Sequence, residues 1–317
     1  MNKRLVNRFK LILIGLGVVA LSCISAKIGC AEDIDKDKEA KRYIEMLKDS
    51  DPDERKVAAF ELGILRDKSA IPALIEATRD RNVEVRKEAL RALRQTAGSL
   101  AIPTLLETLK DKNPEMRISA INELEALKDK SVKPFLLEML DDEDPSVRIA
   151  AIEALREFQD KSVIPDLIKL LKDKNPRVRR SSIETLGKIG DVSIVPNLSK
   201  MLFDKDELVR KAVVIALRRI GDKSAAPALV KALGDKNGDV RYLVVQTINE
   251  WKDASLVPAL IEALGSLNWD KRSNAAFFLG EIGDKRALEP LKKALRLEWK
   301  IAVRKAIREA ITKIEQN

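Results

Sequence analysis

The chain has 317 residues, with 59 lysine and arginine side chains against 50 aspartate and glutamate side chains, and a formal net charge of +9. It contains no histidine and only two cysteines, which excludes Ser-His-Asp and Cys-His catalysis and the common histidine-containing zinc sites. An apolar fraction of 45% beside 34% charged residues is typical of a folded, helix-rich protein. We expect a protein that is not an enzyme and that needs no cofactor and no metal.

Residues 1–31 are predicted to be a secretory signal peptide. Basic side chains without an acid precede the apolar run at 11–22, and the small residues Gly29 and Ala31 suit cleavage after Ala31. Two alternatives stay open: an uncleaved signal anchor, or a lipid on Cys23. Either alternative would attach the chain to a membrane, and we expect no other membrane contact. In each case the protein is exported, to a periplasmic or extracellular space.

The segment at 32–38 is expected to be a disordered linker of acidic and basic residues, followed by a repeat domain at 39–317. Without residues 1–31, 54 basic and 50 acidic side chains remain, a net charge of +4. Residues 32–174 hold 27 basic and 32 acidic side chains, net −5, whereas residues 175–317 hold 27 and 18, net +9. This surplus is small for nucleic-acid binding, which depends on many phosphate contacts, but its asymmetry favours an acidic partner for the carboxyl-terminal half.

The repeat domain is built from a unit of 31 residues. Proline recurs at this step from Pro72 to Pro258, and arginine from Arg55 to Arg272. Each unit has two runs of helical apolar spacing. The first often opens with Asp-Pro or Asn-Pro, favoured at a helix start, and the second follows a turn such as Asp-Lys-Ser. A helix pair of roughly 15 and 11 residues cannot bury its own apolar face, so neighbouring pairs must stack.

The predicted fold is therefore all-α, a right-handed solenoid of stacked helical hairpins. We expect about eight full repeats between residues 51 and 297, with a half repeat at each end, near 40–49 and 300–314. Nothing in the periodicity indicates strands.

The unit resembles the short HEAT repeats known from phycobilisome lyases, as in the segment Asp142-Glu143-Asp144-Pro145-Ser146-Val147-Arg148. The resemblance implies a hydrogen-bond ladder in which the aspartate six residues before each arginine joins the repeats. We interpret this ladder as structural and not as a phosphate-binding stripe, because every arginine in it has an acid at fixed spacing. Before Arg272 and Arg304 the aspartate is replaced by Ser266 and Glu298, so the ladder is expected to weaken there. The predicted ladder pairs are Asp49 and Arg55, Asp80 and Arg86, Asp111 and Arg117, Asp142 and Arg148, Asp173 and Arg179, Asp204 and Arg210, and Asp235 and Arg241.

One charged position of the second helices changes sign along the chain. If these helices line the concave side, as in HEAT proteins, the inner surface changes sign near its middle. We predict that the three central lysines steer an acidic protein partner, the alternative being an ordinary solvated face. In chain order the position reads Glu76, Glu107, Glu138, Lys169, Lys200, Lys231, Glu262 and Lys293.

Three aromatic residues near the carboxyl end are predicted to contribute to binding, since exposed Trp and Tyr are frequent interface hot spots. Tyr242 follows a ladder arginine where other copies have Lys or Arg, so its register predicts exposure. Trp269 replaces proline at a helix start, and Trp299 lies beside an inserted residue. Trp251, by contrast, falls at a core position. The alternative for Trp299 is a role in capping the last repeat.

The predicted function is an exported, non-catalytic scaffold that presents its concave face to a protein partner. Two other classes stay open. The first is a bilin-lyase-like enzyme or enzyme subunit, supported by the family resemblance alone, which an absorbance shift on mixing with bilin would reveal. The second is a HEAT-like nucleic-acid-binding protein, which a steep salt dependence of DNA affinity would reveal.

Overall fold

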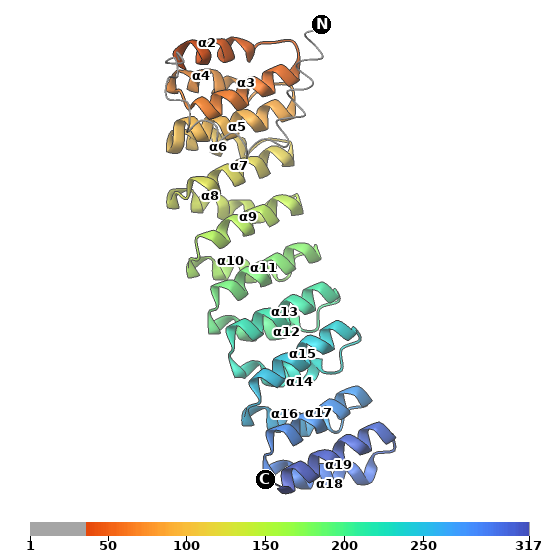
Figure 1. Ribbon diagram of the computed structural model, residues 1–317. Coiled ribbons are helices and arrows are strands. Elements are labelled where there is room, and N and C mark those ends of the chain that lie inside the picture. Colours follow the sequence, from red (N-terminus) through yellow and green to blue (C-terminus); the bar gives the residue numbers. More distant parts are fainter. Residues whose placement is uncertain (1–35, 317) are drawn as a thin grey trace, which may run out of the picture.

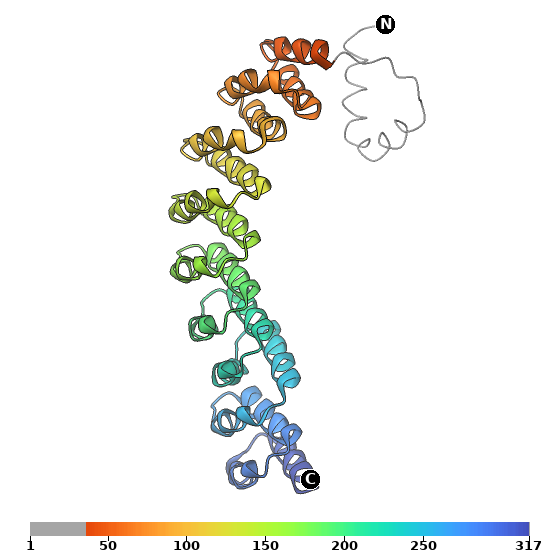
Figure 2. The ribbon, with the colours of Figure 1, turned by 90° about the vertical axis from the view of Figure 1, so that its left-hand side faces the viewer.

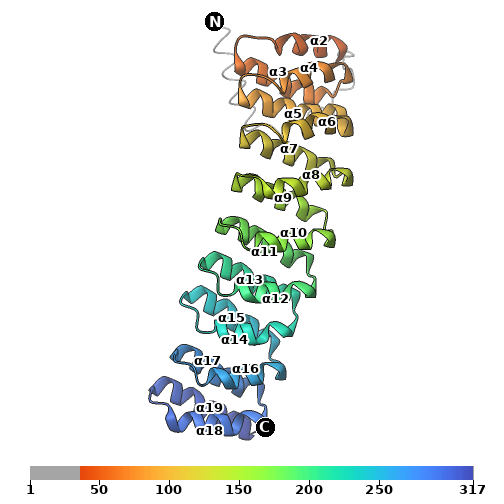
Figure 3. The same ribbon diagram turned by 180° about the vertical axis from the view of Figure 1, so that it is seen from behind.

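A computed structural model describes residues 36–316 as a column of stacked helix pairs. Figures 1 and 3 show from opposite sides that the pairs follow one another in chain order. Eight pairs lie between a single helix α2 (Lys36–Met46) at one end and a single helix α19 (Ile301–Gln316) at the other. No strand occurs in residues 36–316, and the predicted all-α solenoid is confirmed. The signal peptide predicted at 1–31 lies outside the described residues.

The two helices of each pair belong to two adjacent layers, which Figure 2 shows as two rows along the column. The first helices are α3 (Pro52–Leu65), α5 (Val83–Ala97), α7 (Pro114–Leu127), α9 (Pro145–Glu157), α11 (Pro176–Ile189), α13 (Glu207–Ile220), α15 (Gly238–Trp251) and α17 (Trp269–Ile282). The second helices are α4 (Ile71–Ala77), α6 (Ile102–Thr108), α8 (Lys133–Glu138), α10 (Ile164–Leu170), α12 (Val195–Met201), α14 (Ala226–Ala232), α16 (Val257–Ala263) and α18 (Leu288–Leu297).

A short 3₁₀ turn precedes each second helix. Side-chain caps determine where the first helix and this turn begin. Asp51 caps α3 by accepting a hydrogen bond from the backbone N–H of Asp53, and Pro52 stands at the first helical position. Asp67 caps the following turn by accepting from the backbone N–H of Ser69 at 2.8 Å. The turn takes up the first residues of the predicted second helix, which is why these helices have 6 to 10 residues instead of about 11.

The core lies between the two layers and continues from Ala40 to Ile314. Leucine, isoleucine, valine and alanine at the predicted offsets are fully buried, for example Leu90 and Leu93 on α5. Each buried leucine contributes about 2 kcal/mol of transfer free energy. Since each apolar layer is shared by two neighbouring repeats, no repeat is a complete unit by itself. Trp251, predicted for the core, is partly buried against it.

The amino-terminal helix begins earlier than predicted. Residues 36–38, expected to be part of a disordered linker, form the first turn of α2, while 32–35 lie outside the described residues. Asp37 and Glu39 place negative charge at this helix start, where the helix dipole favours it. Ala40 is fully buried, so α2 already covers the end of the core.

Candidate functional site

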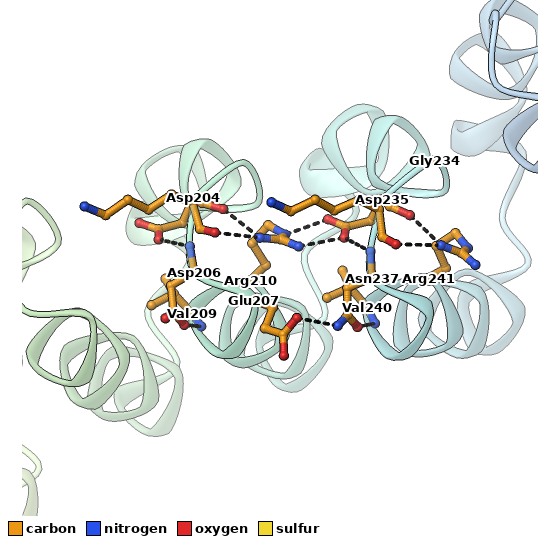
Figure 4. A network of polar contacts seen from close by, with 12 residues as sticks. Asp204, Asp206, Glu207, Val209, Arg210, Gly234, Asp235, Asn237, Val240 and Arg241 are labelled. Carbon is orange, nitrogen blue, oxygen red and sulfur yellow. Dashed lines mark hydrogen bonds and ion pairs between the residues drawn. The ribbon is translucent and has the colours of Figure 1, made fainter.

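A ladder of arginine and aspartate side chains joins the repeats where each second helix passes to the next first helix (Figure 4). Arg210, almost fully buried, donates from Nη1 to the backbone carbonyls of Asp204 at 2.9 Å and Lys205 at 3.3 Å in its own repeat. Its Nε and Nη2 donate to the Asp235 carboxylate of the next repeat at 2.6 and 2.8 Å. The same carboxylate accepts from the backbone N–H of Asn237 at 2.8 Å. One arginine thus holds two junctions in place.

The predicted pairing of each aspartate with the arginine six residues later is wrong for the carboxylate: that arginine binds only the backbone carbonyl of the aspartate, as Arg210 does with Asp204. The carboxylate binds the arginine 25 residues earlier, in the preceding repeat. Three steps depart from this inter-repeat pattern. Arg86 makes no ion pair with Asp111 within residues 36–316, and Arg241 meets no carboxylate because Ser266 stands at the aspartate position. Arg272, in contrast, pairs with Glu298 at 2.6 and 3.0 Å, so the ladder resumes where it was expected to weaken. The longer glutamate side chain serves as acceptor although it comes 26 residues after its arginine, not 25. The other inter-repeat pairs are Arg55 with Asp80, Arg117 with Asp142, Arg148 with Asp173, Arg179 with Asp204, and Arg210 with Asp235.

Hydrogen bonds hold the junction carboxylates in their charged form. The Arg55 guanidinium lowers the pKa of Asp80, against the opposing effect of burial. At the turn between α9 and α10, Lys133 and the backbone and hydroxyl groups of Ser162 lower the pKa of Asp160 to about 2. These carboxylates therefore stay ionised at neutral and mildly acidic pH.

Substitution of Asp160 by asparagine is expected to reduce the acid sensitivity of the fold. Because the folded-state pKa of about 2 lies below the ordinary value of 3.8, the stabilisation is present above the ordinary pKa and is lost as the pH falls toward 2. Asparagine keeps the capping oxygen but does not titrate. Urea unfolding at several pH values from 5 to 2 should show a steeper fall for the wild type than for D160N. Parallel curves would contradict this linkage.

The predicted charged stripe lies on the surface of the second helices. All eight of its side chains are exposed. Lys169 donates to Asp166 on its own helix at 2.8 Å, which offsets part of its charge. Lys200 and Lys231 form no ion pair with any other residue in the described part of the chain. The exposed charge thus changes from acidic to basic between Glu138 and Lys169.

Two of the three predicted aromatic residues lie together and the third lies apart. Trp269 and Trp299, exposed by 43% and 77%, flank the Lys300 ammonium, which is 5.1 and 5.7 Å from their ring centroids. Both line a groove of about 1190 Å³ between the α16–α17 loop and α18. Tyr242, exposed by 63% as its register predicts, is not among the residues that line this groove. Its hydroxyl accepts from the amide of Gln246 at 2.7 Å.

The groove also contains apolar side chains that were not predicted from the sequence. Leu267 and Leu297 line it, and both are largely exposed. The sequence could have indicated Leu267, because the other copies of the repeat have a polar or charged residue at its position. Those residues are Ser50, Arg81, Lys112, Glu143, Lys174, Lys205 and Lys236.

Residues 36–316 contain neither a membrane-spanning helix nor a metal-binding cluster. No helix of this range is both long and apolar enough to cross a membrane. In the same range no three histidine, cysteine, aspartate or glutamate side chains gather in a way that could hold a metal ion. The predicted signal anchor and the lipid on Cys23 concern residues outside the described part.

Comparison with known proteins identifies the family. Three solved structures resemble the fold: an engineered protein (20% identity, TM-score 0.47, 87% of this chain and 88% of that one), the Escherichia coli protein YibA (23%, 0.49, 82% and 96%) and human deoxyhypusine hydroxylase in complex with glycerol (22%, 0.37, 81% and 100%). No curated protein sequence matches the chain. A family model described as HEAT repeats matches residues 40–112, 84–144, 102–175, 133–202, 164–244 and 226–312. Since these matches span almost the whole described region, the chain belongs to the HEAT-repeat family.

Proposed function

We propose that this HEAT-repeat protein is a non-catalytic scaffold that binds an acidic protein partner along the face formed by its second helices. The observation that carries the proposal is the row of exposed lysines at one register position in three consecutive repeats, Lys169, Lys200 and Lys231. Equally spaced charges of one sign attract a partner of opposite charge and set its orientation. The net positive charge of residues 175–317 also attracts an acidic partner.

The ladder supports this function by fixing the helices that bear the lysines. Asp173, Asp204 and Asp235 follow α10, α12 and α14 directly, and each accepts an inter-repeat ion pair. The lysine positions are therefore held in place before a partner arrives. A preorganised surface loses little conformational freedom on binding, so many weak contacts add to a useful affinity.

We also propose that the scaffold works outside the cytoplasm. The charged, apolar and small-residue order of residues 1–31 supports export, and cleavage after Ala31 would leave a chain without thiols. Such a chain is insensitive to an oxidising compartment. The mass of the mature amino-terminal peptide distinguishes this cleavage from a retained anchor and from a lipid on Cys23.

Reversal of the three lysine charges tests the binding face. The triple variant K169E/K200E/K231E is expected to weaken binding of the partner at least tenfold, because exposed charge pairs contribute up to about 1 kcal/mol each. The partner would first be trapped by a photo-crosslinker placed on α12 in native cells and identified by mass spectrometry. Its affinity for each variant would then be measured by calorimetry at two salt concentrations.

The matched control reverses three exposed basic residues of the first helices, Arg177, Lys188 and Arg219. This variant has the same net charge as the triple lysine variant but leaves the second-helix face intact. Equal affinities of the two variants would assign the effect to total charge and would overturn the proposed face.

A further inference from the structure

The ladder is interrupted at Arg241 on α15. Its Nη1 donates to the carbonyls of Asp235 at 2.7 Å and Lys236 at 3.3 Å, as in the other repeats. Its Nε and Nη2, however, make no hydrogen bond or ion pair with any residue of 36–316. Figure 4 shows the contacts passing from Arg210 through Asp235 and stopping at Arg241. The outer edge of this guanidinium, formed by Nε and Nη2, therefore has no hydrogen-bond acceptor among residues 36–316.

This edge of the half-buried Arg241 side chain is not sealed from solvent. Arg86 also lacks its carboxylate, but its Nε is buried, whereas neither nitrogen at the outer edge of Arg241 belongs to the buried unpaired atoms. The neighbouring helices explain the difference. α15 and α17, the first helices on either side of the Arg241 step, pack against each other less extensively than α5 and α7 do on either side of the Arg86 step. The next repeat therefore leaves this edge of the Arg241 side chain accessible.

The chemistry of this edge is visible in the intact steps of the ladder. In Arg55, Arg179 and Arg210, Nε and Nη2 bind the two oxygens of one carboxylate at distances of 2.6 to 2.8 Å. A planar guanidinium whose Nη1 is already held presents the remaining donors in a fixed direction that matches a carboxylate. We propose that Arg241 is a docking site for a carboxylate of the acidic protein partner. This inference rests on the proposed function and names the group that is recognised.

Lys271 adds a positive charge to the first turn of α17, the helix that follows the break in the ladder. Lys271 occupies a position that is buried and apolar in the six preceding repeats. Burial lowers the pKa of Lys271, and the charge of nearby Lys231 acts in the same direction, against that of Glu262. The junction after Arg241 thus has a charge at a position that is apolar in the six junctions before it. The buried apolar residues at the equivalent position are Val85, Met116, Val147, Val178, Val209 and Val240.

Exposed apolar side chains next to Ser266 indicate a second property of the partner. Leu267 directly follows Ser266 and is fully exposed, and with Trp269 it lines the groove that leads to α18. Burial of such side chains provides affinity that a single exposed ion pair does not. We therefore expect an extended acidic segment with an apolar side chain close to its carboxylate.

Arginine Nε–H resonances of the ¹⁵N-labelled repeat domain test the site directly. The Arg241 signal is identified as the one that R241K removes. Titration with the peptide acetyl-Leu-Gly-Asp-Gly-Leu-amide is expected to shift this signal. The asparagine twin, in which asparagine replaces the aspartate of the peptide, is not expected to shift it. Affinity for the aspartate peptide should fall about tenfold in R241K, because lysine keeps the charge but loses the two-point hydrogen bond. R219K on the first-helix layer serves as the matched control.

Three results of the titration would overturn the carboxylate site. An Arg241 signal that stays in place at millimolar peptide, or one that moves equally with the asparagine twin, would overturn the carboxylate assignment. A larger shift with inorganic phosphate than with the peptide would assign the site to phosphate instead. The lysine face is tested separately by the K169E/K200E/K231E variant. If that variant binds the partner as the wild type does while Arg241 still responds to the peptide, the lysine face is wrong. The carboxylate site at Arg241 then stands.

Discussion

Replacement of Arg210 by alanine is expected to lower the free energy of unfolding by about 3–5 kcal/mol, because it leaves the nearly buried Asp235 carboxylate without its partner. The two carbonyls that Arg210 caps also lose their donor. The measurement is urea unfolding followed by far-ultraviolet circular dichroism, with wild type and variant in the same buffer.

Arg241 provides the matched control for this experiment. It has the same register one repeat later and makes the same contacts to backbone carbonyls, but it has no carboxylate partner within residues 36–316. Its replacement by alanine is expected to cost about 1 kcal/mol, the value of ordinary hydrogen bonds. Equal losses for the two variants would mean that the inter-repeat ion pair adds nothing to the backbone capping.

Replacement of Phe278 by alanine is expected to destabilise the carboxyl-terminal repeats by about 3–5 kcal/mol. Phe278 lies on α17 and is fully buried, so alanine removes a large apolar side chain and leaves a cavity between neighbouring helices. The fluorescence of Trp269 and Trp299 is suited to follow this unfolding, since both lie in the same part of the column.

The adjacent Phe277 is the control for this substitution. It packs edge-to-face on Phe278 with ring centroids 5.2 Å apart, but 46% of it is exposed. Its outer side faces the Lys313 ammonium at 5.7 Å. Alanine at Phe277 should therefore cost about 1 kcal/mol, the value of an exposed aromatic contact. A loss for F277A as large as for F278A would contradict the position of the core in this repeat.

The helix pairs were predictable from the sequence because they depend on local rules. Asp51 and Asp67 determine helix starts by accepting hydrogen bonds from the backbone N–H groups two residues later, at Asp53 and Ser69, and these contacts form as expected. The stacking followed from the 31-residue period, since no single pair can bury its own apolar face.

The details of the ladder were less predictable because they depend on how two loops meet in space. The spacing of Arg86 and Asp111 matches that of the intact steps, yet the two side chains are not paired. Glu298 serves as an acceptor despite an extra residue, which no spacing rule covers. Ser266 was recognised as a departure, but that it leaves one edge of Arg241 unsealed from solvent became clear only from the packing of α15 against α17.

The sparse packing of α15 against α17 has a consequence for how the molecule unfolds. In a linear array each repeat is stabilised only by its neighbours, so cooperativity passes along the column through successive interfaces. The interface before α17 lacks a ladder bond and keeps mainly the packing of α16 against α17. We therefore expect the segment from α17 to α19 to open at a lower free energy than the repeats that a ladder bond joins. The groove beside Trp269 and Trp299 belongs to that segment, so its occupation by a partner would be coupled to the local stability of the last repeats.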